Sequence, residues 1–163
     1  MPKDAAPTRA NILAAAVQTL QRGGVEGFTL DAVARRAGVV KGLVLYHYAS
    51  RGRLLRAAAA QIAASRSAAL RRALGSAPGT AGLDACWEEL GRQAEDGTAR
   101  AWLSLSAAGF IDRSARNATF EDAARESIID GAAVALATGV PVADVRDAYD
   151  ALWLALLEVT AKR

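Results

Sequence analysis

Apolar residues recur every three or four positions along most of the chain, which is the period of a helix with one buried face. In the first such stretch, residues 8–21, this spacing places Ile12, Ala16 and Leu20 on one side. The same period continues over residues 30–37, 40–48, 51–74, 83–94, 98–111, 118–138 and 142–161. No segment shows the alternation of a half-buried strand. The pattern predicts an all-α protein with a helix in each of these stretches.

Capping and breaking residues divide the helical stretches. A side-chain oxygen just before a helix can accept a hydrogen bond from a free backbone N–H. The predicted N-caps of this kind are Thr8, Thr29 and Ser50. Gly23-Gly24, Gly38 and Gly139 are expected to end helices, because glycine adopts the left-handed conformation at little cost. Residues 75–82 are predicted to form a loop, and residues 112–117 a polar connection.

Composition narrows the class of protein. Alanine supplies 40 of the 163 residues, which favours helices over strands. The longest uncharged run, residues 131–143, is shorter than the ~20 apolar residues of a membrane-spanning helix. The first residues lack the apolar core of a secretory signal. A single cysteine, Cys86, excludes an intramolecular disulfide and a multi-cysteine zinc site, and a single histidine, His47, excludes a histidine-rich metal site. We therefore expect a cytoplasmic protein that has no metal or other cofactor, does not bind a membrane and is not an enzyme.

The charge is unevenly distributed. Residues 1–75 contain 12 Lys and Arg but only 3 Asp and Glu. Residues 76–163 contain 8 Lys and Arg and 14 Asp and Glu. A basic half joined to an acidic half suggests that the basic half meets a polyanion. Solvated helix faces rich in arginine would give the same numbers, so a motif is needed before the charge indicates nucleic acid.

Residues 29–48 have the plan of a helix-turn-helix, in which a tight turn joins two short helices. Ala37 is small where the two helices would cross, and Gly38 supplies the positive φ of the turn. Val44 and Tyr48, one helical turn apart, are expected to anchor the second helix. A generic three-helix bundle would share these features. The combination with the basic first half favours DNA binding.

The other face of that second helix carries candidates for DNA contact. Amine, guanidinium, phenol and imidazole groups can bind phosphates or base edges, and a leucine can contact a thymine methyl group. The residues of this face are Lys41, Gly42, Leu43, Tyr46, His47 and, just beyond the helix, Arg51.

Residues 8–60 resemble the N-terminal domain of TetR-family transcriptional repressors. The matching segments are Ile12-Leu13, Ala15-Ala16, Gly24, Phe28-Thr29, Val33-Ala34, Ala37-Gly38-Val39, Lys41-Gly42, Tyr46-His47-Tyr48, Ser50-Arg51 and Leu54-Leu55. The resemblance implies a homodimer whose two heads place their third helices in the major groove of a palindromic operator. It also implies a variable helical C-terminal domain that dimerises and binds a small-molecule inducer.

Two positions depart from the family pattern. Val40 stands where the family usually has Ser or Thr, which caps the recognition helix and touches a phosphate; valine can do neither. Leu45 stands where the family commonly has Tyr. Either Tyr46 takes over that contact, or the helix is one residue longer and the turn at Ala49-Ser50 one residue shorter. With these positions included, the predicted DNA-binding residues are Thr29, Val40, Lys41, Gly42, Leu43, Leu45, Tyr46, His47 and Arg51.

The last two helices are predicted to form a dimer interface, because the chain is short for the family. Residues 142–161 are apolar around more than one face, and such a helix is buried by more than its own domain. Two helices from each subunit would make an isologous four-helix interface. The alternative is a buried central helix in a monomer. The predicted interface residues are Ile128, Val134, Tyr149, Leu152, Trp153 and Leu156.

A ligand pocket is predicted between the middle helices and the end of the helix at residues 51–74. The candidate residues are Cys86, Trp87, Trp102 and Phe110. Aromatic residues at helical spacing more often form a core, which is the alternative. No pattern typical of a charged ligand or a metal is present, so a ligand of this pocket would be apolar.

These observations predict a helix-turn-helix DNA-binding domain at residues 8–52 and a ligand-binding and dimerisation domain at residues 53–163. The predicted function is sequence-specific transcriptional regulation by a homodimeric repressor, which a small apolar ligand releases from double-stranded DNA. The alternative is a helical ligand-binding or adaptor protein that keeps the scaffold without binding DNA. A steep salt dependence of DNA binding would separate the two.

Overall fold

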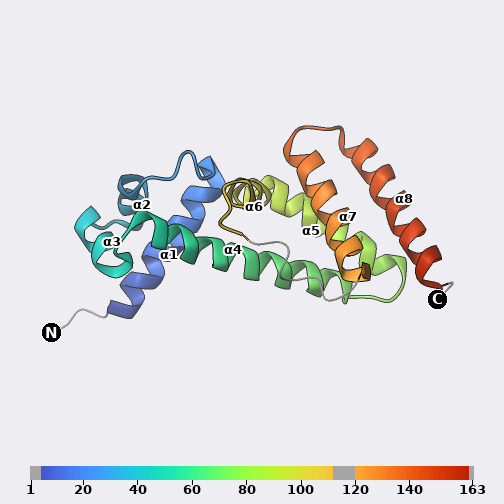
Figure 1. The fold of residues 1–163 in the computed structure, drawn as a ribbon, viewed down its shortest axis with the longest axis horizontal. Coiled ribbons are helices and arrows are strands. Elements are labelled where there is room, and N and C mark those ends of the chain that lie inside the picture. The colour runs from blue at the N-terminus through green and yellow to red at the C-terminus, as the bar shows by residue number, and fades with distance from the viewer. Residues whose placement is uncertain (1–4, 112–119, 162–163) are drawn as a thin grey trace. The chain divides into compact units, whose positions relative to one another are not determined.

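The computed structural model describes residues 5–111 and 120–161. These residues form eight α-helices and no strand (Figure 1). The helices are α1 (Ala5–Gly23), α2 (Leu30–Ala37), α3 (Lys41–Tyr48), α4 (Arg51–Leu74), α5 (Thr80–Glu95), α6 (Thr98–Ala107), α7 (Phe120–Ala137) and α8 (Val142–Ala161). The all-α prediction is confirmed.

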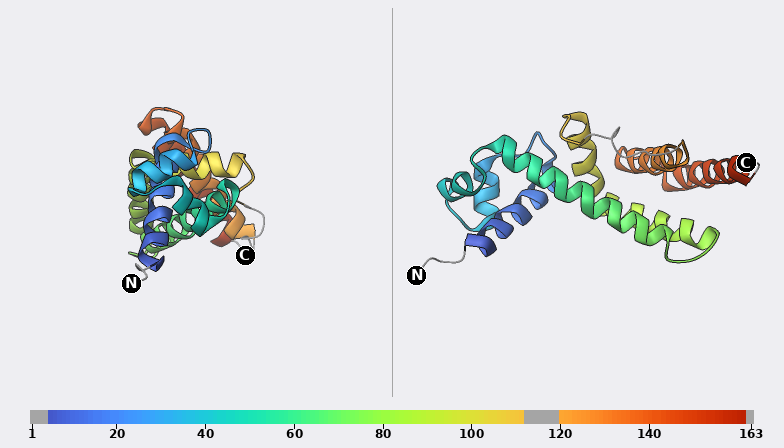
Figure 2. Two further views of the ribbon diagram at one scale, coloured as in Figure 1. Left: turned by 90° about the vertical axis from the view of Figure 1, so that its left-hand side faces the viewer. Right: turned by 60° about the horizontal axis from the view of Figure 1, so that its bottom comes forward.

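The chain divides into two compact units, each with its own core. The first unit takes the described residues up to Ala68 together with Arg100–Ile111, and the second takes Ala69–Ala99 and the described residues beyond 119. The division falls inside α4, which is one continuous helix (Figure 2). The two domains predicted at residues 8–52 and 53–163 are a functional division, which stays a prediction.

The first unit packs α1, α2 and α3 against the first part of α4 and against α6. One apolar cluster joins side chains from all five helices. Apart from alanines, the members that are at most 1% exposed are Ile12, Leu20, Phe28, Val33, Val44, Leu54, Leu55, Ile62 and Leu105. These residues are the periodic apolar positions of the sequence, so the pattern itself defines this core.

Local sequence sets the helix ends around the helix-turn-helix as predicted. The hydroxyl of Thr29 accepts a hydrogen bond from the backbone N–H of Ala32 at 3.1 Å and caps α2. The hydroxyl of Ser50 accepts one from Arg53 at 3.2 Å and caps α4. Gly38 follows α2 with φ 67°, the left-handed conformation that the turn requires.

Two helices begin earlier than predicted. α1 begins at Ala5, so Thr8 lies inside the helix and is not its cap. Pro7 is tolerated there because the N–H groups of a first helical turn have no partner within the helix. α5 begins at Thr80, so Gly82 is helical and not part of a loop. A Cβ at Gly82 would collide with the carbonyl oxygen of Leu74; the glycine therefore permits a close approach between helices.

One helix ends earlier than predicted, and one region lies outside the description. α6 ends at Ala107, not at residue 111, because Gly109 takes φ 74° and turns the chain. The polar connection predicted at residues 112–117 and the helix start predicted at residue 118 lie outside the described residues.

The second unit packs α5, α7 and α8 with the end of α4. α7 and α8 run side by side (Figure 1). Tyr149 and Trp153 of α8 are buried in this core, and the Tyr149 hydroxyl donates to the Leu83 carbonyl at 3.2 Å. Arg146 of α8 forms ion pairs with Asp84 of α5 and with Asp150. Apolar burial and ion pairs thus both link α5 to α8.

The link between α3 and α4 is strained at one residue. Ala49 has φ 60° and ψ −34°. Among the described residues, it is the only one other than glycine that has a positive φ. A side chain at positive φ places its Cβ close to the carbonyl oxygen, which costs about 1 kcal/mol. The two-residue link therefore turns the chain sharply at an energetic cost.

Ala49→Gly is expected to raise the free energy of unfolding by about 1 kcal/mol, because glycine relieves this strain. Urea denaturation measures the change. Ala60→Gly, at an exposed position inside α4, is the matched control and should lower stability by about 1 kcal/mol. A loss of stability in both variants would contradict the strain.

Candidate DNA-binding surface and ligand-binding regions

One face of α3 is fixed to the core of the first unit. Val44 is fully buried and Tyr48 is 5% exposed, which confirms their predicted anchoring role. The Tyr48 hydroxyl also donates a hydrogen bond to the carbonyl of Arg9 in α1 at 3.0 Å. The side-chain amide of Asn11 donates to the carbonyl of Ala37 at 2.9 Å and ties α1 to the end of α2. These contacts orient α3 rigidly within its unit.

The opposite face of α3 is open. Tyr46 is 79% exposed and Leu45 is 38% exposed. At 100° per residue, Tyr46 lies opposite the midpoint between Val44 and Tyr48, whereas Leu45 lies toward one side. α3 ends at Tyr48, and two residues separate it from α4. With these helix bounds, Tyr46 points further outward than Leu45, as their exposed fractions also show.

The remaining candidates surround Tyr46. Lys41 and Gly42 are exposed, and Leu43 and His47 are half-buried. The rings of Tyr46 and His47 meet edge to face with centroids 5.2 Å apart. Val40 is 74% exposed and makes no capping hydrogen bond. The predicted residues of α3 therefore lie together on one accessible surface.

Three of the predicted contacts already have partners within the chain. The hydroxyl of Thr29 is the cap of α2. Lys41 forms an ion pair with Asp31 of α2, with 2.9 Å between Nζ and Oδ2. Arg51 donates from Nε to the carbonyl of Phe28 at 3.0 Å and from its NH2 group to the carbonyl of Val25 at 3.1 Å.

Arg51 thus clamps the segment between α1 and α2 to the start of α4. Its guanidinium also lies over the ring of Phe28, 5.7 Å from the centroid. The sequence offers no local signal for this role, because the partner carbonyls are 23 and 26 positions away along the chain. Arg51 can bind DNA only with the donors that these carbonyls leave free.

The four candidates for a ligand pocket lie in two different cores. Trp102 is 3% exposed in the core of the first unit, where Phe110 packs against the same cluster. The guanidinium of Arg66, itself 6% exposed, lies 4.3 Å from the Trp102 ring centroid. Cys86 is buried in the core of the second unit, and Trp87 packs there against Tyr149 with centroids 5.3 Å apart.

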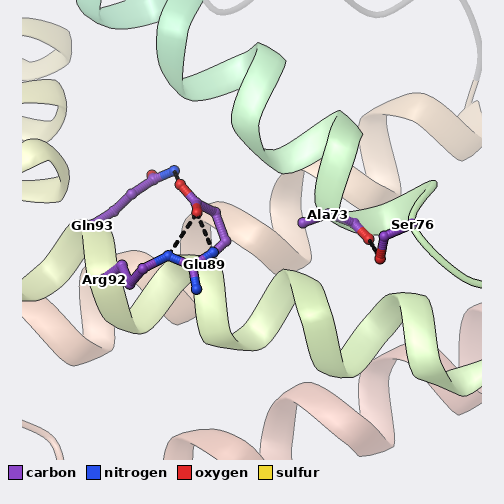
Figure 3. Close-up of polar contacts among 5 residues, drawn as sticks. All are labelled: Ala73, Ser76, Glu89, Arg92 and Gln93. Atoms are coloured by element: carbon purple, nitrogen blue, oxygen red, sulfur yellow. Dashed lines mark hydrogen bonds and ion pairs between the residues drawn. The ribbon is translucent and has the colours of Figure 1, made fainter.

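A polar groove of about 530 Å³ between the end of α4 and α5 was not predicted. Glu89 accepts hydrogen bonds there from Arg92 at 3.0 Å and from Gln93 at 2.7 Å (Figure 3). Burial opposes ionisation of Glu89, but these hydrogen bonds and the charges of Arg92 and Arg72 together outweigh it and lower the pKa of the carboxyl group. Ser76, at the edge of the groove, donates to the carbonyl of Ala73 (Figure 3). Glu89 and Arg92, two of the charged residues that line the groove, thus pair with each other.

The predicted dimer residues divide into buried and exposed groups. Ile128, Tyr149 and Trp153 are 8%, 2% and 4% exposed and belong to the core of the second unit. Leu152 is 52% exposed and Val134 is 41% exposed. Leu156 is partly buried against the core. Only the exposed members are available to a second subunit without repacking.

An apolar hollow of about 180 Å³ lies between α7 and α8. Leu152 forms part of its lining together with small residues of both helices. The lining residues are Ile128, Gly131, Ala132, Ala135, Val140, Asp144, Val145, Ala148, Tyr149 and Leu152. This face of the α7–α8 pair is therefore concave, mainly apolar and open.

Two features are absent from residues 5–111 and 120–161. None of these helices is long and apolar enough to cross a membrane. The same residues contain no cluster of three His, Cys, Asp or Glu side chains that could hold a metal ion.

A first unit that presents an anchored helix on its surface has the architecture of a helix-turn-helix protein. Residues 12–58 match the family model described as bacterial regulatory proteins, tetR family. This segment therefore matches the N-terminal helix-turn-helix domain of that family, as the resemblance implied. Among curated proteins, none matches the sequence significantly.

Solved structures share the fold of the chain. A TetR-like transcriptional regulator from Rhodococcus sp. RHA1 is 20% identical, with a TM-score of 0.64 over 100% of both chains. The TetR family protein CprB from S. coelicolor A3(2) is 23% identical, with a TM-score of 0.53 over 94% of this chain and 88% of that one. A gamma-butyrolactone receptor described as ArpA-like is 25% identical, with a TM-score of 0.52 over the same shares.

Arg51→Ala is expected to lower the free energy of unfolding by about 1–2 kcal/mol, because two hydrogen bonds from a charged group to backbone carbonyls are lost. Lys41→Ala removes only an exposed ion pair and should change stability by less than about 0.5 kcal/mol. Urea denaturation compares the two variants. Equal stabilities would show that Arg51 is not a structural clamp.

Proposed function

We propose that the protein is a homodimeric repressor that binds a palindromic operator through α3 and leaves it when a small apolar ligand binds. The observation that carries this proposal is the outward face of α3. Tyr46 is 79% exposed on a helix whose other face is anchored by Val44 and Tyr48. A rigid helix with an exposed aromatic and polar face suits the major groove, which admits one α-helix.

The proposed contacts divide by type. Lys41, with the donors that Arg51 has free, binds phosphates and so sets orientation without reading sequence. Tyr46 and His47 reach base edges, and Leu43 contacts apolar groups in the groove. Val40 makes no phosphate contact, since its side chain has no donor. Thr29, Gly42 and Leu45 lie at the margin of the contact, where backbone and apolar groups approach the DNA.

Lys41→Ala and Arg51→Ala are each expected to weaken binding to all DNA sequences. Each lost phosphate contact should flatten the slope of log K against log salt by about one unit, because fewer counterions are released. Fluorescence anisotropy over a series of salt concentrations measures both quantities. Unchanged affinity and slope in both variants would contradict the assignment of this surface to DNA.

The proposed dimer is formed by α7 and α8 of each subunit. The apolar hollow between these helices and the exposed Leu152 and Val134 support this choice. A two-fold axis would bring the same face of both subunits together into a four-helix bundle. The interface would rest on a core that includes Ile128, Tyr149 and Trp153. These buried residues hold the exposed residues of α7 and α8 in place. Leu156 adds the part of its side chain that the core leaves open.

Leu152→Glu is expected to give monomers, because the variant places a charge in the apolar interface. The matched control is Leu154→Glu. Leu154 is 58% exposed and, two residues further along α8, lies on the opposite side of the helix. Sedimentation velocity measures the oligomeric state. A Leu152→Glu variant that is soluble and still dimeric would place the interface elsewhere.

The proposed release depends on α4, the helix that has residues in both units. A ligand that displaces this helix changes the distance between the two α3 helices of the dimer. It can do so only if it binds the separated state more tightly than the DNA-competent state. The candidates for contact with such a ligand are Cys86 and Trp87 in one core and Trp102 and Phe110 in the other.

The cores that hold these four residues are mainly apolar, although the Arg66 guanidinium lies against Trp102, and they favour an uncharged ligand. The receptor that shares 25% identity with this chain is described as one for gamma-butyrolactone, a small uncharged molecule. This description supports a ligand of that class for the present chain. Thermal denaturation in the presence of candidate lactones tests it, because a ligand that binds the folded state raises the melting temperature.

A further inference from the structure

The ion pair between α2 and α3 lies at the proposed DNA surface. Asp31 is in the first turn of α2 and Lys41 is the first residue of α3. The Lys41 Nζ lies 2.9 Å from Asp31 Oδ2, and the two side chains are 51% and 63% exposed. The pair is therefore accessible to solvent and can open without disturbing the core.

Asp31 is also isolated in the sequence. It is the only acidic residue between Glu26 and Asp84, a stretch that contains nine Lys and Arg. A carboxylate beside a phosphate backbone is repelled by it, and the repulsion weakens binding to DNA of any sequence. The Asp31 carboxylate therefore opposes the attraction between the basic residues of this stretch and DNA phosphates.

We propose that Asp31 is a positioning residue that holds Lys41 and lowers the affinity of the first unit for DNA phosphates. This role rests on the proposed function of α3 in DNA binding. When α3 enters the groove, Lys41 exchanges a carboxylate partner for a phosphate partner, so the contact yields less than an unpaired lysine would. Asp31 itself loses a partner and gains a negatively charged neighbour.

The consequence is a limit on binding to DNA of any sequence. Contacts to phosphates carry no sequence information. A carboxylate that weakens one of them lowers the general affinity and leaves the contacts of Tyr46 and His47 with base edges untouched. Asp31 is thus a repulsive element of the kind that keeps a binding protein from attaching to wrong sites.

Asp31→Asn tests the proposal on a fluorescent duplex of random sequence, for which no operator is needed. The affinity is expected to rise about two- to fivefold, the range that one exposed ion pair can contribute. The gain should shrink as salt is raised, because exposed charges are screened. Glu26→Gln is the matched control. It removes the same charge at an exposed position of the same unit and should change the affinity less.

Two further measurements separate this role from a structural one. In a Lys41→Ala background, Asp31→Asn should raise the affinity less than in the wild type, because the competition for Lys41 is absent and only the direct repulsion between Asp31 and phosphate remains. Thermal denaturation should show a slightly lower stability for Asp31→Asn, because a carboxylate in the first turn of a helix is favourable. A merely structural role would lower stability and affinity together.

The outcomes are distinct. An affinity that is unchanged or reduced in Asp31→Asn would overturn the proposal, as would a gain that is just as large without Lys41. In either case the wild-type protein still binds the duplex, and the proposed function stands. If the folded wild-type protein does not bind the duplex even at low salt, the proposed function fails, and the role of Asp31 fails with it.

Discussion

The burial of one face of α3 is the constraint on which the first unit depends. A helix of eight residues is too short to be stable in water by itself, and α3 has no side-chain cap at Val40. Val44 and Tyr48 supply the missing stability by inserting into the core, and the Tyr48 hydroxyl bonds to α1. The same burial decides which side chains remain outside. Stability and the presentation of the proposed DNA surface therefore have one cause.

The cations around α3 show how structural and functional demands meet on one surface. Arg51 joins the start of α4 to the segment between α1 and α2, and Lys41 joins α3 to α2. Both therefore stabilise the arrangement of the motif before any DNA is present. The contacts of Arg51 are the stronger of the two, because hydrogen bonds from a charged group to fixed backbone carbonyls stabilise more than an ion pair with an exposed carboxylate.

Much of this fold could be predicted from the sequence, because the relevant forces are local. Periodic apolar residues located the helices, and Thr29, Gly38 and Ser50 set their ends through contacts within a few residues. Predictions were wrong where a contact between residues that are not neighbours in the sequence determines the local structure. Gly82 looks like a loop residue, yet it is helical where α5 meets the end of α4 closely. The clamp formed by Arg51 depends on carbonyls that no local pattern indicates.

The predicted sites show the same limit. The face of α3 follows from helical periodicity alone, so its residues could be placed together. The aromatic residues of the middle helices could not, because periodicity does not say which core a side chain enters. Trp102 lies in one core and Trp87 in the other. The sequence also did not show which apolar residues of α8 are buried. Tyr149 lies in the core, whereas Leu152 is exposed on the surface of the helix.

The central claim is that α3 of a dimer reads a palindromic operator. It is tested most directly by selecting bound sequences from a library of random duplexes with the purified protein. The account predicts an enriched palindrome with half-sites about one helical turn apart, roughly 34 Å. A folded, dimeric protein that enriches no sequence would contradict the account and favour a ligand-binding or adaptor protein built on the same scaffold.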